Sequence, residues 1–210
     1  MKQAHYHHRH SPSPASLPED AVPAWLHPTS RAYLSERGLS KDEVEEYDLH
    51  YSQSGYWKNR VIIPIYDKHG KLIAFQGRIV NPEYTGKDRY LTEGPRPLFV
   101  PWEGTARLPG AVLVLVEGPF DVISVNRVLP AAAILGSGLS VDQITQLFVL
   151  VSDYHFTQLL IWLDHGELEK AYTVALKTNT FIHTQVVLVD AKDPGELSKN
   201  DVKTIIREYI

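Results

Sequence analysis

Two different rhythms of hydrophobic and polar residues divide the chain. From residue 110 on, short apolar runs alternate with segments whose apolar residues recur at helical spacing. The runs are AVLVLVE, AAAIL, QLLIWLD and TQVVLVD; the segments are PFDVISVNRVL, SVDQITQLFVLV, ELEKAYTVALKT and a last one near DVKTIIREYI. Strands that are apolar throughout are buried on both faces. This half therefore predicts an α/β fold with a mostly parallel sheet flanked by helices.

The pattern before residue 110 is different and predicts an α+β part. PTSRAYLSERGLSKDEVEEYDLHYS is typical of two short helices, the second opened by Ser40 and Glu43 at the spacing of a capping box. RVIIPIYDKHGKLIAFQGRIV predicts a β-hairpin that turns at Gly70. Residues 81–109 are rich in Gly and Pro, so we expect loops there with short strands at RYL and LFV.

The N-terminus has the composition of a leader. Residues 1–28 combine HYHHRH with SPSPASLPEDAVP, and this density of Pro and Ser opposes regular structure. We expect a flexible leader over residues 1–28, a basic strand-rich subdomain over 29–109 and an α/β domain over 110–210.

Composition excludes several kinds of chemistry. The 210 residues are 43% hydrophobic, which is enough for a core, and Cys is absent, which rules out disulfides, thiolate zinc sites and a cysteine nucleophile. Without a signal core or a membrane-spanning run, we expect a cytoplasmic protein with no membrane partner.

Charge is unevenly distributed along the chain. Residues 58–107 carry nine basic and five acidic side chains, whereas residues 108–210 carry seven and twelve. A basic middle beside an acidic half suits the binding of a polyanion next to a metal site. On the counts alone, ordinary surface charge explains the asymmetry better.

Carboxylates follow the predicted strands of the second half. Glu117 ends the first run, Asp164 the third and Asp190 the fourth, with Asp193 just beyond, and Asp121 lies in the first turn of the helix after Glu117. Ligands of open α/β sheets bind at the carboxyl ends of the strands. Clustered carboxylates repel one another unless a cation neutralises them, and Mg²⁺ prefers such oxygens. The pattern predicts a divalent-metal site that handles phosphates.

Each acid also has a structural explanation. Asp121 would favour the dipole of its helix, Asp164 could cap the helix that starts near Glu167, and Asp193 before Pro194 is typical of a turn. Glu117 has no obvious structural role at the end of its strand.

The acidic segments resemble a known domain. LVLVEGPFDVISV, LLIWLDHGE and AKDPGEL are similar, in order and spacing, to the three acidic motifs of the Toprim domain, which bacterial-type primases, topoisomerases and some nucleases share. RVIIPIYDKHGKLIAFQGRIV with KDRYLTEGPRPLFVPWE resembles the basic subdomain that precedes Toprim in bacterial-type (DnaG-like) primases, and RAYLSERGLSKDEVEEYDLHYS resembles the helical segment before it. The likeness covers roughly residues 29–200.

The resemblance implies roles for particular residues. It makes Glu117, Asp164 and Asp121 catalytic, with Mg²⁺ or Mn²⁺ as cofactor. The implied metal ligands are Glu117, Asp164, Asp193 and Glu167. The side chains expected to contact nucleotide or template phosphates are Lys58, Arg60, Arg78, Lys87, Arg89 and Arg96.

The chain departs from the family pattern at the metal motif. Gly166 stands where the second aspartate of the Asp-x-Asp pair is expected, and Gly195 where the family often has an acid. His165 and Glu167 flank the gap. The zinc-binding and helicase-interacting domains of full primases have no counterpart in the sequence, which is typical of a phage or mobile element.

Three functions remain open. The leading hypothesis is a primase-type nucleotidyltransferase in DNA replication that makes short RNA primers from NTPs on single-stranded DNA, with a replicative helicase or a separate zinc-module protein as candidate partners. The alternative is a catalytically weakened Toprim subunit that binds nucleic acid for a replication complex. A Toprim nuclease is the third, and it leaves the basic subdomain without a purpose.

Overall fold

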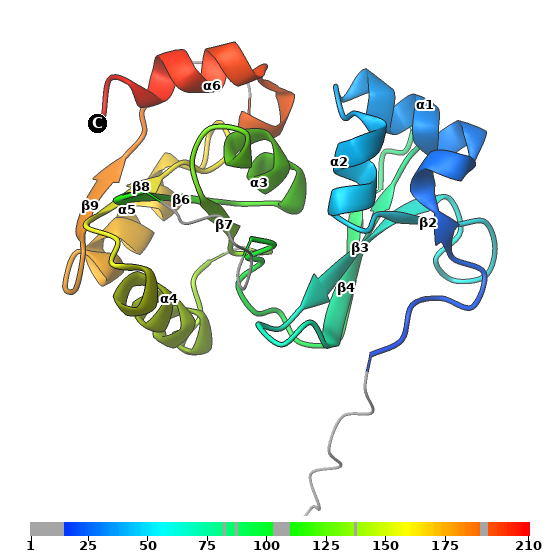
Figure 1. The fold of residues 1–210 in the computed structure, drawn as a ribbon, viewed down its shortest axis with the longest axis horizontal. Coiled ribbons are helices and arrows are strands. Elements are labelled where there is room, and N and C mark those ends of the chain that lie inside the picture. Colours follow the sequence, from blue (N-terminus) through cyan, green and yellow to red (C-terminus); the bar gives the residue numbers. More distant parts are fainter. Residues whose placement is uncertain (1–14, 82, 87, 103–109, 137, 190–192) are drawn as a thin grey trace, which may run out of the picture.

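The computed structural model describes residues 15–81, 83–86, 88–102, 110–136, 138–189 and 193–210. These residues form two lobes, each built on its own β-sheet, and the lobes lie side by side (Figure 1). The expectations for Lys87 and Asp190 fall outside the described residues. No helix in these ranges is both long enough and apolar enough to cross a membrane.

The N-terminal lobe is a five-stranded sheet with neighbouring strands antiparallel, in the order β1-β2-β3-β4-β5. Its strands are β1 (Val22–Pro23), β2 (His50–Ser52), β3 (Arg60–Tyr66), β4 (Leu72–Ile79) and β5 (Tyr90–Glu93). The predicted hairpin is confirmed, since β3 pairs with β4 and Gly70 turns the chain at a φ of 76°. The helices α1 (Pro28–Glu36) and α2 (Lys41–Glu46) are also confirmed, including the capping box of Ser40 and Glu43.

The prediction of a leader up to residue 28 was wrong for its last part. Residues 22–23 form β1, and a 3₁₀ turn η1 (Ala24–Leu26) follows. Asp20 accepts hydrogen bonds from the backbone N–H groups of Gln53 and Ser54 at 2.8 and 2.7 Å. These contacts span more than 30 residues of sequence, so a local count of Pro and Ser does not reveal them.

The C-terminal lobe is the predicted parallel sheet, with strand order β7-β6-β8-β9. Its strands are β6 (Val112–Val116), β7 (Ala131–Ala133), β8 (Gln158–Ile161) and β9 (His183–Val186). Its helices are α3 (Pro119–Asn126), α4 (Val141–Tyr154), α5 (Leu168–Thr178) and α6 (Lys199–Ile206), with a 3₁₀ turn η2 (Pro194–Glu196) before α6.

Both faces of this sheet are covered, which explains the continuous apolar runs. On β6, Val114 and Val116 pack with residues of α3 and α6, whereas Leu113 and Leu115 pack with residues of α4 and α5. The expected short strand at LFV is present only as a bridge: Phe99 exchanges backbone hydrogen bonds of 2.9 and 3.0 Å with Ala133 at the outer edge of β7. The parallel arrangement brings the carboxyl ends of all four strands to one edge.

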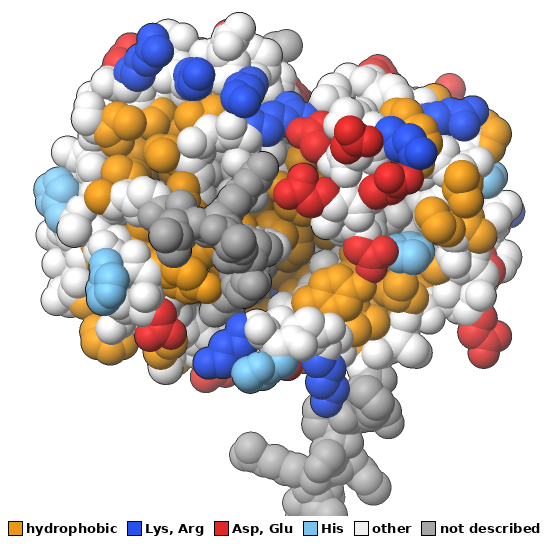
Figure 2. Space-filling view, in the orientation of Figure 1, with side chains coloured by type: hydrophobic (Ala, Val, Ile, Leu, Met, Phe, Trp, Pro, Cys, Tyr) orange, Lys and Arg blue, Asp and Glu red, His pale blue; other side chains and the backbone are white. Residues whose placement is uncertain are grey.

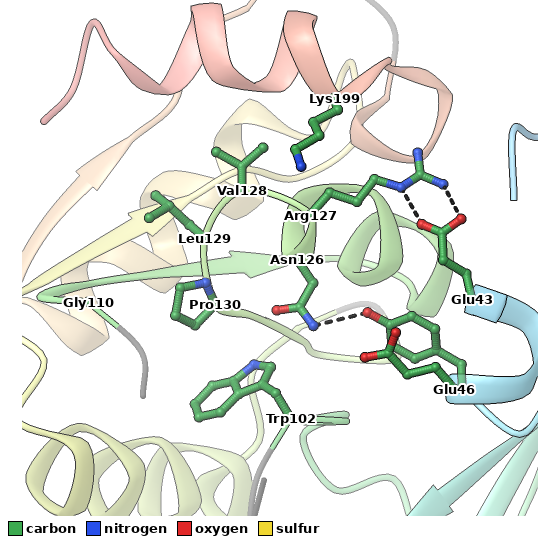
Figure 3. A pocket seen from close by; sticks show the side chains of 11 residues that line it. Glu43, Glu46, Trp102, Gly110, Asn126, Arg127, Val128, Leu129, Pro130 and Lys199 are labelled. Atoms are coloured by element: carbon green, nitrogen blue, oxygen red, sulfur yellow. Dashed lines mark hydrogen bonds and ion pairs between the residues drawn. The ribbon is translucent and has the colours of Figure 1, made fainter. Parts of the chain in front are cut away.

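Direct contacts join the two lobes. One hydrophobic cluster contains buried residues from both lobes. Arg127, from the end of α3, makes an ion pair with Glu43 of α2 (Figure 3), with 2.6 Å between Nε and Oε1. Asn126 donates a hydrogen bond of 3.0 Å to the hydroxyl of Tyr47. Figure 2 shows acidic side chains over α2 opposite basic side chains over α6. The division into domains after residue 109 stays a prediction.

Candidate active site between the lobes

A cavity of about 530 Å³ lies where the carboxyl edge of the parallel sheet faces the antiparallel sheet. The C-terminal lobe supplies its acids and the N-terminal lobe most of its cations. The acids are Glu117, Asp121, Asp164, Glu167, Asp193 and Glu196; the cations are Arg37, Arg78, Arg89 and Arg96, with Lys170 from the C-terminal lobe. The structure thus brings together the carboxylates that the sequence spreads over 80 residues.

Glu117 follows β6 directly and points into the cavity wall beside a lysine. The Nζ atom of Lys170, on α5, lies 2.9 Å from Glu117 Oε2, and this oxygen is buried with no aligned hydrogen bond. Lys170 also lies 3.9 Å from an oxygen of Glu167, one helical turn away. The ammonium group therefore neutralises the glutamate that we expected to bind metal.

Asp164 follows the end of β8 and carries an oxygen without a partner. Its Oδ1 atom is buried and makes no hydrogen bond to the described residues. Burial raises the pKa of Asp164 to about 7, and the negative charges of Asp121, Glu117 and Asp193 add to this. The positive charge of Lys170 acts in the opposite direction. This carboxyl group is therefore held in surroundings that favour a nearby cation.

Asp121 has a structural task at the same place. Its Oδ2 accepts the N–H of Gly118 at 2.8 Å, which caps α3, and its Oδ1 accepts the N–H of Gly195 at 2.8 Å. Burial raises its pKa to about 6 against the effect of these two bonds, with help from the charges of Asp193 and Glu117. Asp121 thus fixes the loop after β6 against the turn before α6, and its catalytic role stays a prediction.

The two remaining expected ligands differ in their surroundings. Asp193 Oδ1 accepts the backbone N–H of His165 at 2.8 Å, which ties the loop after β8 to the loop after β9. Glu167 is 48% exposed and caps no helix N–H group through its side chain. Both line the cavity, and their binding of metal stays a prediction.

Gly166 has a backbone conformation that explains its residue type. Its φ is +91°, a region that side chains with a Cβ atom rarely adopt. An aspartate here would be strained, although its Cβ atom would meet nothing within 4 Å. In this conformation of the loop, the backbone disfavours the second acid of the expected pair.

The donor set can be compared with what a divalent cation requires. In the described part of the chain, no group of three or more His, Asp or Glu residues is close enough to hold a metal ion by itself. Mg²⁺, however, is often bound by one or two carboxylates together with water and substrate phosphates. Asp164, with its buried unpartnered oxygen, and Glu117 beside it fit that smaller requirement.

Basic side chains form the opposite wall of the cavity. Arg78 of β4 lies over the ring of Tyr90 with 4.8 Å between guanidinium carbon and ring centre, and its Nε donates to the hydroxyl of Tyr33 at 3.1 Å. These aromatic contacts orient the guanidinium group. Arg89 and Arg96 line the same cavity with exposed side chains that are suited to phosphates.

Two of the basic residues expected to contact phosphates, Arg60 and Lys58, do not line this cavity. Arg60 is buried: its guanidinium donates to the carbonyls of Gly77, Arg89 and Asp88 at 3.0 to 3.1 Å. It therefore holds β4 against the segment before β5, and its expected phosphate contact was wrong for this conformation. Lys58 is exposed and does not line the cavity.

Three charged side chains of the cavity were missed by sequence reasoning, namely Arg37, Lys170 and Glu196. Arg37, just after α1, lies over the rings of Tyr33 and Phe120 at 5.0 and 4.9 Å and so sits between the lobes. Lys170 carried one weak signal, since it stands three residues after Glu167 at a helical spacing. Only the folded arrangement shows that its closer partner is Glu117.

The arrangement of an antiparallel sheet beside a parallel one, with a cavity between them, is the fold of DnaG-like primase catalytic cores. The catalytic domain of a DnaG primase bound to single-stranded DNA superimposes with a TM-score of 0.70 and 20% identity, over 88% of this chain and 74% of that one. The zinc-binding and RNA polymerase domains of the Aquifex aeolicus primase superimpose with a TM-score of 0.71 and 21% identity. This match covers 88% of this chain and 57% of that one.

Sequence comparison leads to the same proteins. The DNA primase of Clostridium acetobutylicum is 28% identical over 189 residues, which cover 82% of this chain and 30% of the primase. No protein-family model matches the chain. The chain is thus a relative of bacterial DNA primases with the fold of the DnaG-like catalytic core, as the sequence motifs indicated. It spans about a third of the length of the curated relatives that it matches.

Proposed function

We propose that this chain is a primase-type nucleotidyltransferase that joins NTPs into short RNA primers on single-stranded DNA. The observation that carries the proposal is the cavity in which acids at the carboxyl ends of β6 and β8 face arginines of the antiparallel sheet. Phosphoryl transfer requires little beyond such positioning and charge stabilisation.

The residues of the cavity divide the work by charge. Arg78, Arg89 and Arg96 would bind phosphates of the incoming nucleotide or of the template, since guanidinium groups match phosphate oxygens in two-pronged hydrogen bonds. Asp164 and Glu117 would hold Mg²⁺ or Mn²⁺. When bound, the ion would activate the attacking 3′-hydroxyl and stabilise the pyrophosphate that leaves. Asp121 would keep the loop that carries Glu117 in place.

Single-stranded DNA as template is supported by similarity. The matching DnaG catalytic domain is described as bound to single-stranded DNA. The arginine wall of this chain offers the electrostatic track that such binding uses. A replicative helicase and a separate zinc-module protein are proposed as partners in the same way, because full primases act with such modules.

A priming assay tests the proposal. The protein is incubated with single-stranded DNA, NTPs and Mg²⁺ or Mn²⁺, and RNA products are resolved by length. We expect primers with wild-type protein, and a loss of roughly 100-fold or more in Glu117→Gln, in line with the removal of one charge-stabilising group at a reacting centre. Glu208→Gln, at an exposed glutamate after α6, is the matched control. Equal yields from the two variants would refute the role of Glu117.

A second function is favoured by Gly166 and the shortage of metal ligands. The described residues contain no cluster of three metal ligands, and Gly166 carries no carboxylate. In this second function, the chain is an accessory subunit of a replication complex, and its cavity binds single-stranded DNA without catalysing primer synthesis. This function predicts DNA binding that is unchanged by a chelator, and no primers with either metal. Fluorescence anisotropy with labelled DNA, with and without EDTA, separates the two functions.

A further inference from the structure

Lys170 is in an unusual position for a lysine on a helix. Its side chain is only 13% exposed, and its Nζ atom lies closer to Glu117, on another element, than to Glu167 on its own helix: 2.9 against 3.9 Å. On ordinary helices, a lysine usually forms an exposed ion pair with an acid one turn away on the same helix. Lys41 and Glu45 of α2 form such a pair here. The chain thus directs a cation into the acidic edge of the sheet.

The loop before α5 shows a matching loss of negative charge. Gly166, four residues before Lys170, carries no carboxylate, and its φ of +91° disfavours one. The edge therefore has one acid fewer than the Asp-x-Asp pattern requires, and Lys170 places a buried cation beside its acids. Both features reduce the positive charge that bound ions must supply.

We propose that Lys170 is a built-in counter-ion of this edge: it orients Glu117 and supplies one of the positive charges that a divalent ion would otherwise supply, so that a single Mg²⁺ completes the site through Asp164. The inference rests on the proposed function for the presence of Mg²⁺. Lys170 is a positioning residue, because it acts through Glu117.

The unpartnered oxygen of Asp164 supports these separate roles, in which Lys170 neutralises Glu117 and Mg²⁺ binds Asp164. Lys170 contacts Glu117 and leaves Asp164 Oδ1 without a hydrogen bond to the described residues. A cation beside Glu117 repels a second cation in the same cavity. Removal of the lysine charge should therefore strengthen the binding of Mg²⁺, whereas removal of a lysine that only packs should leave it unchanged or weaken it.

Titration calorimetry with MgCl₂ alone tests the inference on the whole chain. The variants are Lys170→Gln, which removes the charge, Lys170→Arg, which keeps it, and Lys177→Gln, at an exposed lysine two turns further along α5. We expect Lys170→Gln to bind Mg²⁺ about tenfold more tightly than wild type, as removal of a neighbouring like charge requires. The other two variants should stay within about twofold of wild type, since neither loses that charge.

Thermal unfolding gives a second measurement that does not depend on activity. In EDTA, Lys170→Gln should melt below wild type, because Glu117 is left without its cation, and Mg²⁺ should restore its Tm by more than it raises that of wild type. Unchanged Mg²⁺ affinity in Lys170→Gln, or no Mg²⁺ binding by any variant, would overturn the inference. If affinity rises as expected while no protein makes primers, the inference stands and the proposed function fails.

Discussion

The contact between Arg127 and Glu43 should contribute measurably to stability, because it joins the two lobes through partly buried side chains. Arg127 Nε donates to Glu43 Oε1 at 2.6 Å, and its Nη2 donates to Glu43 Oε2 at 3.1 Å and to the carbonyl of Gly38 at 2.9 Å (Figure 3). The perturbation is Arg127→Met, which keeps the length of the stem and removes the three donors.

The expected magnitude follows from the exposure of the two side chains. Arg127 and Glu43 are 19% and 22% exposed, which lies between a surface pair and a buried one. Surface pairs contribute about 0–1 kcal/mol, and loss of one partner of a buried pair costs about 3–5 kcal/mol. After the loss, Glu43 still accepts the N–H of Ser40 at 2.8 Å, which limits the penalty. We therefore expect a loss of about 2 kcal/mol, or roughly 4–8 °C in Tm for a chain of this size.

Urea unfolding followed by circular dichroism measures this loss, with two matched comparisons. Lys41→Met removes the cation of an exposed pair on α2, whose side chains are 56% and 58% exposed, and should change stability by only about 0.2–0.5 kcal/mol. A double-mutant cycle with Glu43→Gln should give a coupling of about 1–2 kcal/mol. If Arg127→Met loses no more stability than Lys41→Met, the contact does not hold the lobes together.

Three further outcomes are expected from single changes. Gln143 is buried, and its Nε2 donates to the carbonyl of Ile134 at 2.7 Å. Gln143→Leu should therefore lower the free energy of unfolding in urea by about 1–3 kcal/mol. An unchanged midpoint would show that the carbonyl of Ile134 finds another donor. Gly195→Ala would place a Cβ atom 2.6 Å from Asp121 Oδ1, so it should cost about 1–3 kcal/mol in the same measurement, whereas Gly138→Ala meets nothing within 4 Å and should be neutral. Partial burial raises the pKa of Glu43, but hydrogen bonds from Arg127 and Ser40 outweigh it and lower the pKa below its ordinary value of 4.5. Since the unfolded chain takes up the proton first, this stability is present above pH 4.5 and is lost as the pH falls through the folded pKa, so Glu43→Gln should lose less stability on acidification than wild type.

Most of the fold could be predicted because its signals are local. The capping box of Ser40 and Glu43 forms as predicted, and the first three apolar runs of the second half are strands buried on both faces. The fourth run begins in β9, an edge strand with exposed residues. The end of the expected leader could not be predicted in this way. Residue Asp20 is fixed by the loop after β2, and such a partner leaves no trace in the residues around it.

The candidate site also has a part that the sequence predicts and a part that depends on the folded structure. The topology of a parallel sheet is sufficient to bring Glu117 and Asp164 to one edge, and the structure places both on one cavity. The roles of the basic residues depend instead on the depth of each side chain. Arg60 and Arg78 look alike in sequence, yet the backbone carbonyls around Arg60 use its donors, whereas Arg78 lines the cavity.

The change at Gly166 shows why counting acids in a motif is a poor guide to the charge of a site. A side chain at a positive φ costs about 1–2 kcal/mol, so Gly166→Asp would add a carboxylate only against the preference of its own backbone. The same turn sets where α5 begins, and the phase of that helix brings Lys170, rather than Glu169, to Glu117. The glycine thus leaves out one negative charge, and Lys170, four residues on, places a positive charge at the same edge. Both features act on the net charge of the site. Gly166→Asp alone should therefore gain little Mg²⁺ affinity as long as Lys170 remains, whereas the double variant Gly166→Asp with Lys170→Gln should bind Mg²⁺ more tightly than either single variant.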